Sequence, residues 1–209
     1  MLEKQDAQNA QQTQEVQNIQ VKNVCMDASE IERSLTRMAH QILEYNKGTK
    51  DLAIVGIVTR GDLLANKIVD KIEEIEGVRL PMGKLDISLY RDDFMMHLSP
   101  EVHSTSIDFN VDGKKIVLID DVLFSGRTVR AALDAVMDLG RPRAIQLAVL
   151  VDRGHRELPI RADFVGKNVP SKTNENVRLY LEEVDGKSSV EIFEKEPGKR
   201  IGSAPLGGE

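Results

Sequence analysis

A short apolar run that ends in two adjacent acids constrains the fold of this chain more than any other feature. The run Lys115–Ile119 is apolar and β-branched, which is typical of a buried strand in a parallel sheet. Asp120 and Asp121 follow it directly, and a turn of small residues then leads into a helical pattern. In open α/β sheets, ligands bind beyond the carboxyl ends of the strands. We therefore expect a ligand site at this end of the sheet.

The acid pair and the turn after it favour different parts of one ligand. Adjacent carboxylates with no basic neighbour repel each other, but they suit vicinal hydroxyls and a bound cation. Ser125–Thr128 opens a helix, where N–H groups, hydroxyls and the positive end of the helix dipole favour a phosphate monoester. The expected apolar face of this helix is Val129, Leu133, Val136 and Met137. The alternative is a capped turn without a ligand, since serine and threonine are ordinary N-cap residues.

Two further strand candidates precede charged turns. Leu52–Val58 leads through Thr59, Arg60 and Gly61 into a helix with Leu64, Ile68, Ile72 and Ile75 inside. On its own this turn is a weak signal, because glycine at a helix start and a surface arginine are common. Ala144–Val151 is the other candidate, and the region around it is basic. From Arg141 to Lys172 there are seven Lys/Arg against three acids, a net of +4 in a chain of net charge −6. A local patch of this kind can bind phosphates although the whole chain is acidic.

The first helix combines an apolar stripe with a polar face. It should begin near Asp27 or Ser29, with Glu30 or Glu32 completing a capping box. Its expected stripe is Ile31, Leu35, Met38 and Ile42, and Asn46-Lys47-Gly48 ends it. The opposite face carries Arg33, Thr36, Arg37 and His40. Alone, this face is more typical of an ordinary solvated helix surface than of a binding site.

Length and composition predict one α/β domain with polar ends. The chain has 209 residues, of which 41% are hydrophobic, enough for one core. We expect a polar extension at 1–24, a domain at 25–194 and a tail at 195–209. No apolar stretch is long enough for a membrane span, and no signal peptide is recognisable. Cys25 is the only cysteine, which predicts a reducing, cytoplasmic location and a small half-buried side chain rather than a nucleophile.

One long irregular segment interrupts the domain. Leu85–Tyr90 alternates as a strand does, and about 18 residues without periodicity follow. Such a stretch is usually a lid or a disordered loop, and the alternative is a solvated hairpin. We expect His97 and His103 in this stretch to be exposed rather than metal-binding.

The segment Val117–Val129 resembles the 5-phosphoribosyl-1-diphosphate (PRPP) binding motif of type I phosphoribosyltransferases. The resemblance implies an α/β fold with a central, mostly parallel sheet flanked by helices, a small hood and a flexible loop. It implies that Asp120 and Asp121 hold the ribose hydroxyls, with Mg²⁺ bound through PRPP and these acids as candidate further ligands. The implied PRPP-binding residues are Asp120, Asp121, Val122, Leu123, Phe124, Ser125, Gly126, Arg127 and Thr128. Purine-salvage members usually carry an acid at Phe124, so this residue favours a pyrimidine base.

The same resemblance implies further site residues. The diphosphate-binding residues are Thr59, Arg60, Gly61, Tyr90 and Arg91, of which Arg60 and Arg91 are catalytic together with the acid pair. Asp152, Phe164 and Val165 are implied to bind the base in or near the hood. For Phe164 the alternative is a core position, which is the commoner role of an aromatic residue in a short β run.

Within the superfamily, one subgroup is most similar. Leu35–His40, Tyr90–Asp93, the PRPP segment and Val151–Asp163 resemble the bacterial pyrimidine operon attenuators, which are also uracil phosphoribosyltransferases. The resemblance implies conversion of uracil and PRPP to UMP and diphosphate, and binding of pyrimidine-operon mRNA that depends on uridine nucleotides. It also implies a homodimer or a higher homo-oligomer. The implied RNA-binding residues are Thr36, Arg37, His40, Arg156, Arg161 and Lys167. The alternatives are an RNA-binding nucleotide sensor with little catalysis, and a purine phosphoribosyltransferase without RNA function.

Overall fold

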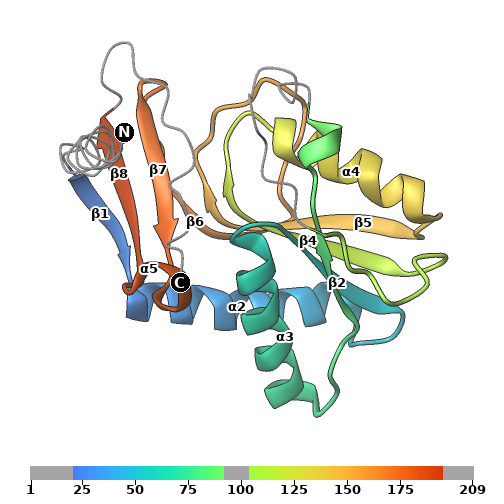
Figure 1. The fold of residues 1–209 in the computed structure, drawn as a ribbon. Helices are drawn as coiled ribbons and strands as arrows, with labels where there is room; N and C mark the ends of the chain where they lie inside the picture. Colours follow the sequence, from blue (N-terminus) through green and yellow to red (C-terminus); the bar gives the residue numbers. More distant parts are fainter. Residues whose placement is uncertain (1–20, 92–103, 195–209) are drawn as a thin grey trace, which may run out of the picture.

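The central element is a parallel sheet of five strands (Figure 1). The computed structural model describes residues 21–91 and 104–194. The strands are ordered β3-β2-β4-β5-β6, and every neighbouring pair is parallel. Their bounds are β2 Leu52–Ile57, β3 Met82–Leu85, β4 Lys115–Leu123, β5 Ala144–Asp152 and β6 Phe164–Asn168. The expected parallel α/β fold is therefore confirmed.

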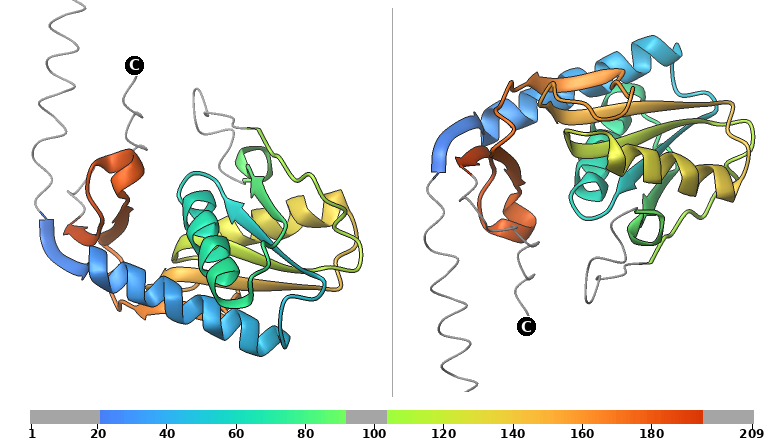
Figure 2. Two further views of the ribbon diagram at one scale, coloured as in Figure 1. Left: turned by 90° about the horizontal axis from the view of Figure 1, so that it is seen from below. Right: turned by 90° about the horizontal axis from the view of Figure 1, so that it is seen from above.

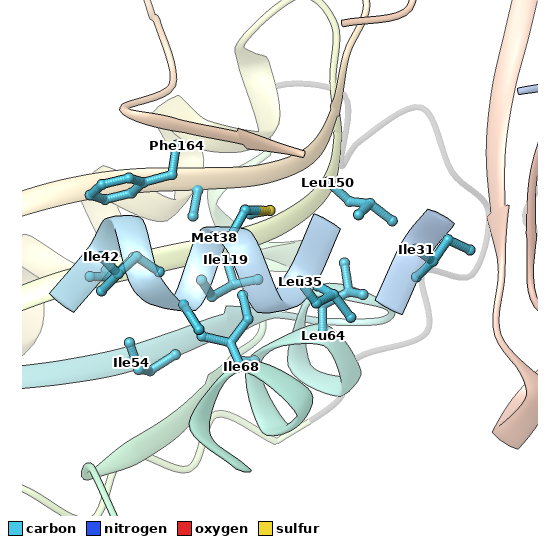
Figure 3. Close-up of a cluster of buried hydrophobic side chains, with 14 of the residues drawn as sticks. Ile31, Leu35, Met38, Ile42, Ile54, Leu64, Ile68, Ile119, Leu150 and Phe164 are labelled. Atoms are coloured by element: carbon cyan, nitrogen blue, oxygen red, sulfur yellow. The ribbon is translucent and has the colours of Figure 1, made fainter. Parts of the chain in front are cut away.

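Helices cover both faces of this sheet. α2 (Ala28–Asn46) and α3 (Gly61–Glu76) pack on one face, and α4 (Arg127–Leu139) packs on the other (Figures 1 and 2). The expected capping box is confirmed, because Asp27 accepts from the Glu30 N–H while the Glu30 carboxylate accepts from the Asp27 N–H. The stripe of α2 is buried as predicted and faces the apolar side chains of the sheet and of α3 (Figure 3).

Two residues of the predicted apolar faces are exposed, so the prediction that they face the core is wrong. Ile75 is 39% exposed at the last turn of α3, and Met137 is 61% exposed on α4. The buried side of α4 instead includes three alanines at 131, 132 and 135. Because alanine is small, this side of the helix can lie close to the sheet, and Met137 is turned to the surface. None of the described helices is long and apolar enough to cross a lipid bilayer.

The strand predicted over Leu85–Tyr90 is also wrong. β3 ends at Leu85, and Ser88–Tyr90 forms a 3₁₀ helix, η2. The Asp86 carboxylate accepts hydrogen bonds from the Ser88 N–H (2.7 Å) and the Ser88 hydroxyl (2.6 Å). A short side chain that bonds the backbone two residues on turns the chain, so the alternation does not continue as a strand.

A small antiparallel sheet forms a hood beyond one end of the main sheet (Figure 2). It consists of β1 (Val21–Asp27), β8 (Ser189–Glu194) and β7 (Glu175–Tyr180), with the short helix α5 (Glu182–Asp185) between the last two. The boundary expected after residue 24 is therefore wrong, because residues 21–24 pair with β8. Residues 1–20 and 195–209, and His97 and His103, lie outside the described residues.

Candidate active site

The acid pair lies within the carboxyl-end part of β4. Asp120 is 6% exposed and Asp121 is half-buried. Each carboxylate accepts a hydrogen bond from the next backbone N–H, from Asp121 to Asp120 at 3.0 Å and from Val122 to Asp121 at 2.7 Å. The strand thus continues through the acids, where the sequence predicted its end. Next to β4, β5 ends at Asp152, which pairs with Leu123.

Burial makes both carboxylates hard to ionise. It raises the pKa of Asp120 well above its ordinary value, and the charge of Asp121 raises it further, while Arg91 opposes the shift. Burial also raises the pKa of Asp121, against the Val122 N–H and the charge of Arg60. The protein therefore compensates the two negative charges only in part. A ligand that brings hydroxyl donors or a cation would complete the compensation.

The turn after the acids opens toward the N-terminus of α4. Gly126 has φ +91°, a conformation that side chains disfavour, and the Ser125 hydroxyl accepts from the first N–H of the helix, that of Arg127, at 3.4 Å. The Ser125 carbonyl accepts from the N–H groups of Glu157 (3.0 Å) and Leu158 (3.1 Å). The loop after β5 therefore holds the turn in place, and the helix end can meet an anion.

A second turn approaches the acid pair from β2. A Cβ on Gly61 would lie 2.4 Å from the Ile119 carbonyl oxygen, so only glycine fits where α3 starts against β4. Beside it, the peptide bond Val58–Thr59 is cis and Thr59 is exposed. Arg60 donates to the Asp185 carboxylate of the hood at 2.9 Å, and its charge acts on Asp121. The structure thus places the predicted diphosphate turn beside the acid pair.

Of the two residues expected from the loop, only Arg91 acts on the acids. Its charge lowers the pKa of Asp120. The Tyr90 hydroxyl instead donates to Asp138 at 2.9 Å, and its carbonyl accepts from Arg130 at 2.9 Å. Because Asp138 is near the C-terminus of α4, this hydroxyl points away from the acid pair. In this structure η2 places Tyr90 against α4, and its assignment to the diphosphate stays a prediction.

Among the three expected base-binding residues, only Asp152 lies at the carboxyl end of the sheet. It accepts from the Gly154 N–H (2.8 Å) and from Arg156 (2.6 Å). Phe164 is 4% exposed at the other end of β6 and lies in the core (Figure 3). Its ring meets the Tyr45 ring edge-on, with 5.7 Å between the centroids. Its assignment to the base is wrong, because the first residue of this parallel strand lies at the opposite end from the site. Val165 is half-buried against the α4 face of the core, and its assignment to the base stays a prediction.

The expected RNA-binding residues divide into two groups. Thr36, Arg37 and His40 are exposed on α2, and Arg37 donates to the carbonyls of Val165 (3.2 Å) and Gly166 on β6. Lys167 on β6 reaches back to the Cys25 carbonyl at 2.7 Å. These four residues therefore belong to one face.

Arg161 and Arg156 lie in the loop between β5 and β6. Arg161 is exposed. Arg156 is held by Asp152 (2.6 Å), the Phe124 carbonyl (3.2 Å) and the Ile160 carbonyl (2.7 Å). Arg156 therefore supports the acid-pair site itself, and its guanidinium is not a free surface cation.

The chain matches known proteins over most of its length. Residues 26–183 match the family model "Phosphoribosyl transferase domain". "Bifunctional protein PyrR" of Thermus aquaticus is 62% identical over 172 residues, which cover 82% of this chain and 95% of the relative. The protein of the same name from Clostridioides difficile is 58% identical over 81% of this chain and 96% of its own. The chain belongs to the PyrR family.

Solved structures share the fold of this PyrR family member. A hypoxanthine phosphoribosyltransferase from Staphylococcus aureus is 19% identical, with a TM-score of 0.62 over 85% of this chain and 94% of its own. The enzyme of the same name from Trypanosoma cruzi is 16% identical, with a TM-score of 0.64 over 84% of this chain and 98% of its own. At such identities the likeness concerns the architecture.

Sequence reasoning missed two residues that tie the hood to the site. Asp185 of α5 is separated from its partner Arg60 by 125 positions, and both side chains are less than 20% exposed. Arg153, beside Asp152, is a buried cation that contacts both Phe124 and the start of β7. No local pattern marks either contact, because each depends on how the hood folds back over the strand ends.

Proposed function

We propose that this chain transfers the phosphoribosyl group of PRPP to uracil and that it also binds pyrimidine-operon mRNA in response to uridine nucleotides. The observation that carries the enzymatic part is the buried acid pair of β4, followed within six residues by the N-terminus of α4, which begins after a glycine N-cap. The two features suit the ribose diol and the 5′-phosphate of one ligand. The PyrR relatives are named "bifunctional", in agreement with a second role.

The chain's own residues would bind and orient PRPP. Asp120 and Asp121 accept hydrogen bonds from the ribose hydroxyls, and the backbone of Ser125–Thr128 holds the 5′-phosphate. Thr59, Arg60 and Gly61, with Arg91, surround the diphosphate and neutralise it as it leaves. The bond from ribose C1′ to the diphosphate oxygen breaks, uracil N1 bonds to C1′, and the N1 proton passes to water or to the departing diphosphate. This chemistry depends on positioning and electrostatic stabilisation and needs no covalent nucleophile.

A magnesium ion fits the acid pair when PRPP is present. In residues 21–91 and 104–194 no group of three or more His, Cys, Asp or Glu could hold a metal, so the phosphate oxygens of PRPP would be needed as further ligands. Bound there, the ion would balance the negative charge of the diphosphate. The raised pKa of Asp120 supports this proposal, since the carboxylates lack full compensation within the protein.

The regulatory part would use the face of α2 and β6. Thr36, Arg37, His40 and Lys167 lie on this face, with Arg161 on the adjoining loop. UMP bound at the acid pair would favour RNA binding only to the extent that it binds the RNA-competent state more tightly. A homodimer or a higher homo-oligomer would bring two such faces together and enlarge the basic surface.

One assay tests the enzymatic part. The protein is mixed with Mg²⁺, PRPP and radiolabelled uracil, and UMP is measured beside parallel reactions with hypoxanthine and guanine. We expect UMP and little purine nucleotide. Absence of UMP would support a sensor without catalysis, and faster use of a purine would support the salvage alternative.

A second assay tests the regulatory part. Pyrimidine-operon leader RNA is titrated with the protein, with and without UMP, at fixed salt. We expect tighter binding with UMP. Equal affinity in both titrations would contradict regulation through the acid-pair site.

A further inference from the structure

Arg153 is a buried cation that the proposed reaction does not use. It is 5% exposed at the carboxyl end of β5, and burial lowers the pKa of its guanidinium while the charge of Glu175 opposes the shift. A charged group is costly to bury unless hydrogen bonds replace its water. The contacts of Arg153 therefore show what this charge holds in place.

Three of these contacts reach the segment that leads into the hood. Nε donates to the Ser171 hydroxyl at 2.7 Å, and Nη2 donates to the carbonyls of Lys172 at 3.1 Å and Glu175 at 2.6 Å. Glu175 is the first residue of β7, and its carboxylate accepts from the Lys172 N–H at 2.7 Å. Arg153 thus fixes the point at which the chain enters the hood.

A fourth contact reaches the PRPP segment. The guanidinium carbon of Arg153 lies 4.0 Å from the centroid of the Phe124 ring, a cation–π distance. The Arg153 N–H donates to the Leu123 carbonyl at 3.0 Å. His155 repeats the link, because its ring meets Phe124 edge-on at 5.7 Å and its Nε2 bonds the Ser171 carbonyl. One guanidinium therefore joins the middle of the PRPP segment to the base of the hood.

We propose that Arg153 is a positioning residue that sets the separation between the hood and the PRPP segment, and that this separation selects the size of the base. The inference rests on the proposed function. A base joined to a ribose that is held by the acid pair must lie between the PRPP segment and the hood. Arg153 bonds both of these, so it determines how thick and how wide a base can be accommodated.

The arrangement requires arginine rather than any cation. A guanidinium is planar, so it can stack on Phe124 while its edge donates to three acceptors. Lysine keeps the charge, but it is a point donor without a stacking face. Arg153→Lys therefore preserves the charge and removes the geometry.

The decisive experiment compares Arg153→Lys with Arg178→Lys. Arg178 also stacks on an aromatic ring, that of Tyr180 at 5.2 Å, but both residues belong to β7. For Arg153→Lys we expect the Kd of UMP and the KM of uracil to rise about tenfold, with the Kd of PRPP changed less than about twofold. We also expect the preference for uracil over hypoxanthine to decrease. For Arg178→Lys we expect all four quantities to stay within about twofold of the parent protein.

Two outcomes would overturn the proposal. One is an unchanged affinity for UMP in a folded Arg153→Lys protein, and the other is an equal loss of UMP and PRPP binding. If this variant does not fold, Phe124→Leu tests the same link, because it removes the ring and leaves the Arg153 hydrogen bonds. We expect it to weaken UMP binding about fivefold, and an unchanged affinity for UMP would contradict the proposal. The Kd values of UMP and PRPP are binding measurements, so they test the proposal even if the parent protein forms no UMP, a result that would contradict only the proposed catalysis.

Discussion

At the scale of single residues, the acid pair favours ligand binding but lowers the stability of the folded protein. Asp120 is almost fully buried next to a second carboxylate, and burial raises the pKa of both. Near neutral pH the folded protein must therefore either keep unfavourable charges or retain a proton. Such positions are typical of functional sites, where binding rather than folding accounts for the residue type.

Asp120→Asn tests this conflict. The amide keeps an oxygen that can accept the Asp121 N–H, and it removes a buried charge next to another carboxylate. We expect the free energy of unfolding at pH 7.5 to rise by about 1 kcal/mol, or about 2–4 °C in Tm for a chain of this size. We expect UMP formation to fall about 100-fold or more. Calorimetry and the uracil assay measure the two effects, and a less stable variant would contradict the argument.

The same pKa shift predicts how that difference depends on pH. The pKa of Asp120 is higher in the folded state than in the unfolded state. The folded protein therefore loses stability as pH rises from the unfolded pKa, about 3.9, through the folded pKa. Below that range Asp120 is protonated in both states and resembles an amide. We expect the Tm advantage of Asp120→Asn to grow from pH 4 toward pH 7.5, as followed by thermal unfolding in a pH series. An advantage that shrinks with rising pH would show that burial does not raise this pKa.

Phe164 offers a test of a residue that belongs to the core. Phe164→Leu keeps an apolar side chain and leaves space beside Tyr45 and α2. We expect it to lower the free energy of unfolding by about 1 kcal/mol and to leave the KM of uracil unchanged. Urea denaturation and steady-state kinetics measure these quantities. A marked rise in the KM of uracil would restore Phe164 to the base site.

At the scale of elements, the hood meets the diphosphate turn as well as the PRPP segment. Arg60, at the start of α3, donates to both oxygens of Asp185 in α5, at 2.9 and 3.3 Å. Asp185 also accepts from the Leu181 N–H at 2.9 Å, so the backbone of the hood holds its carboxylate in place toward Arg60. Asp185 therefore neutralises part of the Arg60 charge, which would otherwise stabilise the diphosphate.

In Asp185→Asn the Arg60 charge is no longer neutralised by a carboxylate, so it should bind the diphosphate more strongly. We expect the KM of PRPP to fall about threefold, because Arg60 no longer shares its charge with a carboxylate. The matched control is Glu183→Gln, which removes one charge from the same helix, where the partner is Lys67 at 2.6 Å. A KM that rises in Asp185→Asn alone would mean that Asp185 orients Arg60 instead of competing for it.

At the scale of the whole molecule, the active site and the expected RNA face share the loop between β5 and β6. Arg161 in this loop is exposed, whereas Arg156 is bonded to Asp152 and to Phe124. The two arginines are close in sequence but belong to different parts of the site. This loop is therefore a physical connection through which nucleotide binding can influence RNA binding.

Alanine variants of the two arginines should separate these parts. We expect Arg161→Ala to weaken RNA binding about tenfold, with the salt slope reduced by about 1 and uracil turnover unchanged. We expect Arg156→Ala to impair turnover as well, because it frees Asp152 and the Phe124 carbonyl. Arg143→Ala, at the other end of β5, controls for the loss of surface charge. RNA titrations at several salt concentrations, with parallel uracil assays, measure these effects, and unimpaired turnover in Arg156→Ala would contradict the assigned support role.

The sequence alone determined the parts of this protein that depend on neighbouring residues. The strands through Ile119 and Val151, the capped start of α2 and the turn at Gly126 follow from local pattern and backbone preference. The acid pair could also be predicted, because its two carboxylates belong to adjacent residues of the sequence. Tertiary structure decided which side chains reach the site. It turned Tyr90 onto α4, buried Phe164, and brought Arg153 and Asp185 to residues far away in the sequence, since these contacts depend on how the hood and the loops pack against the strand ends.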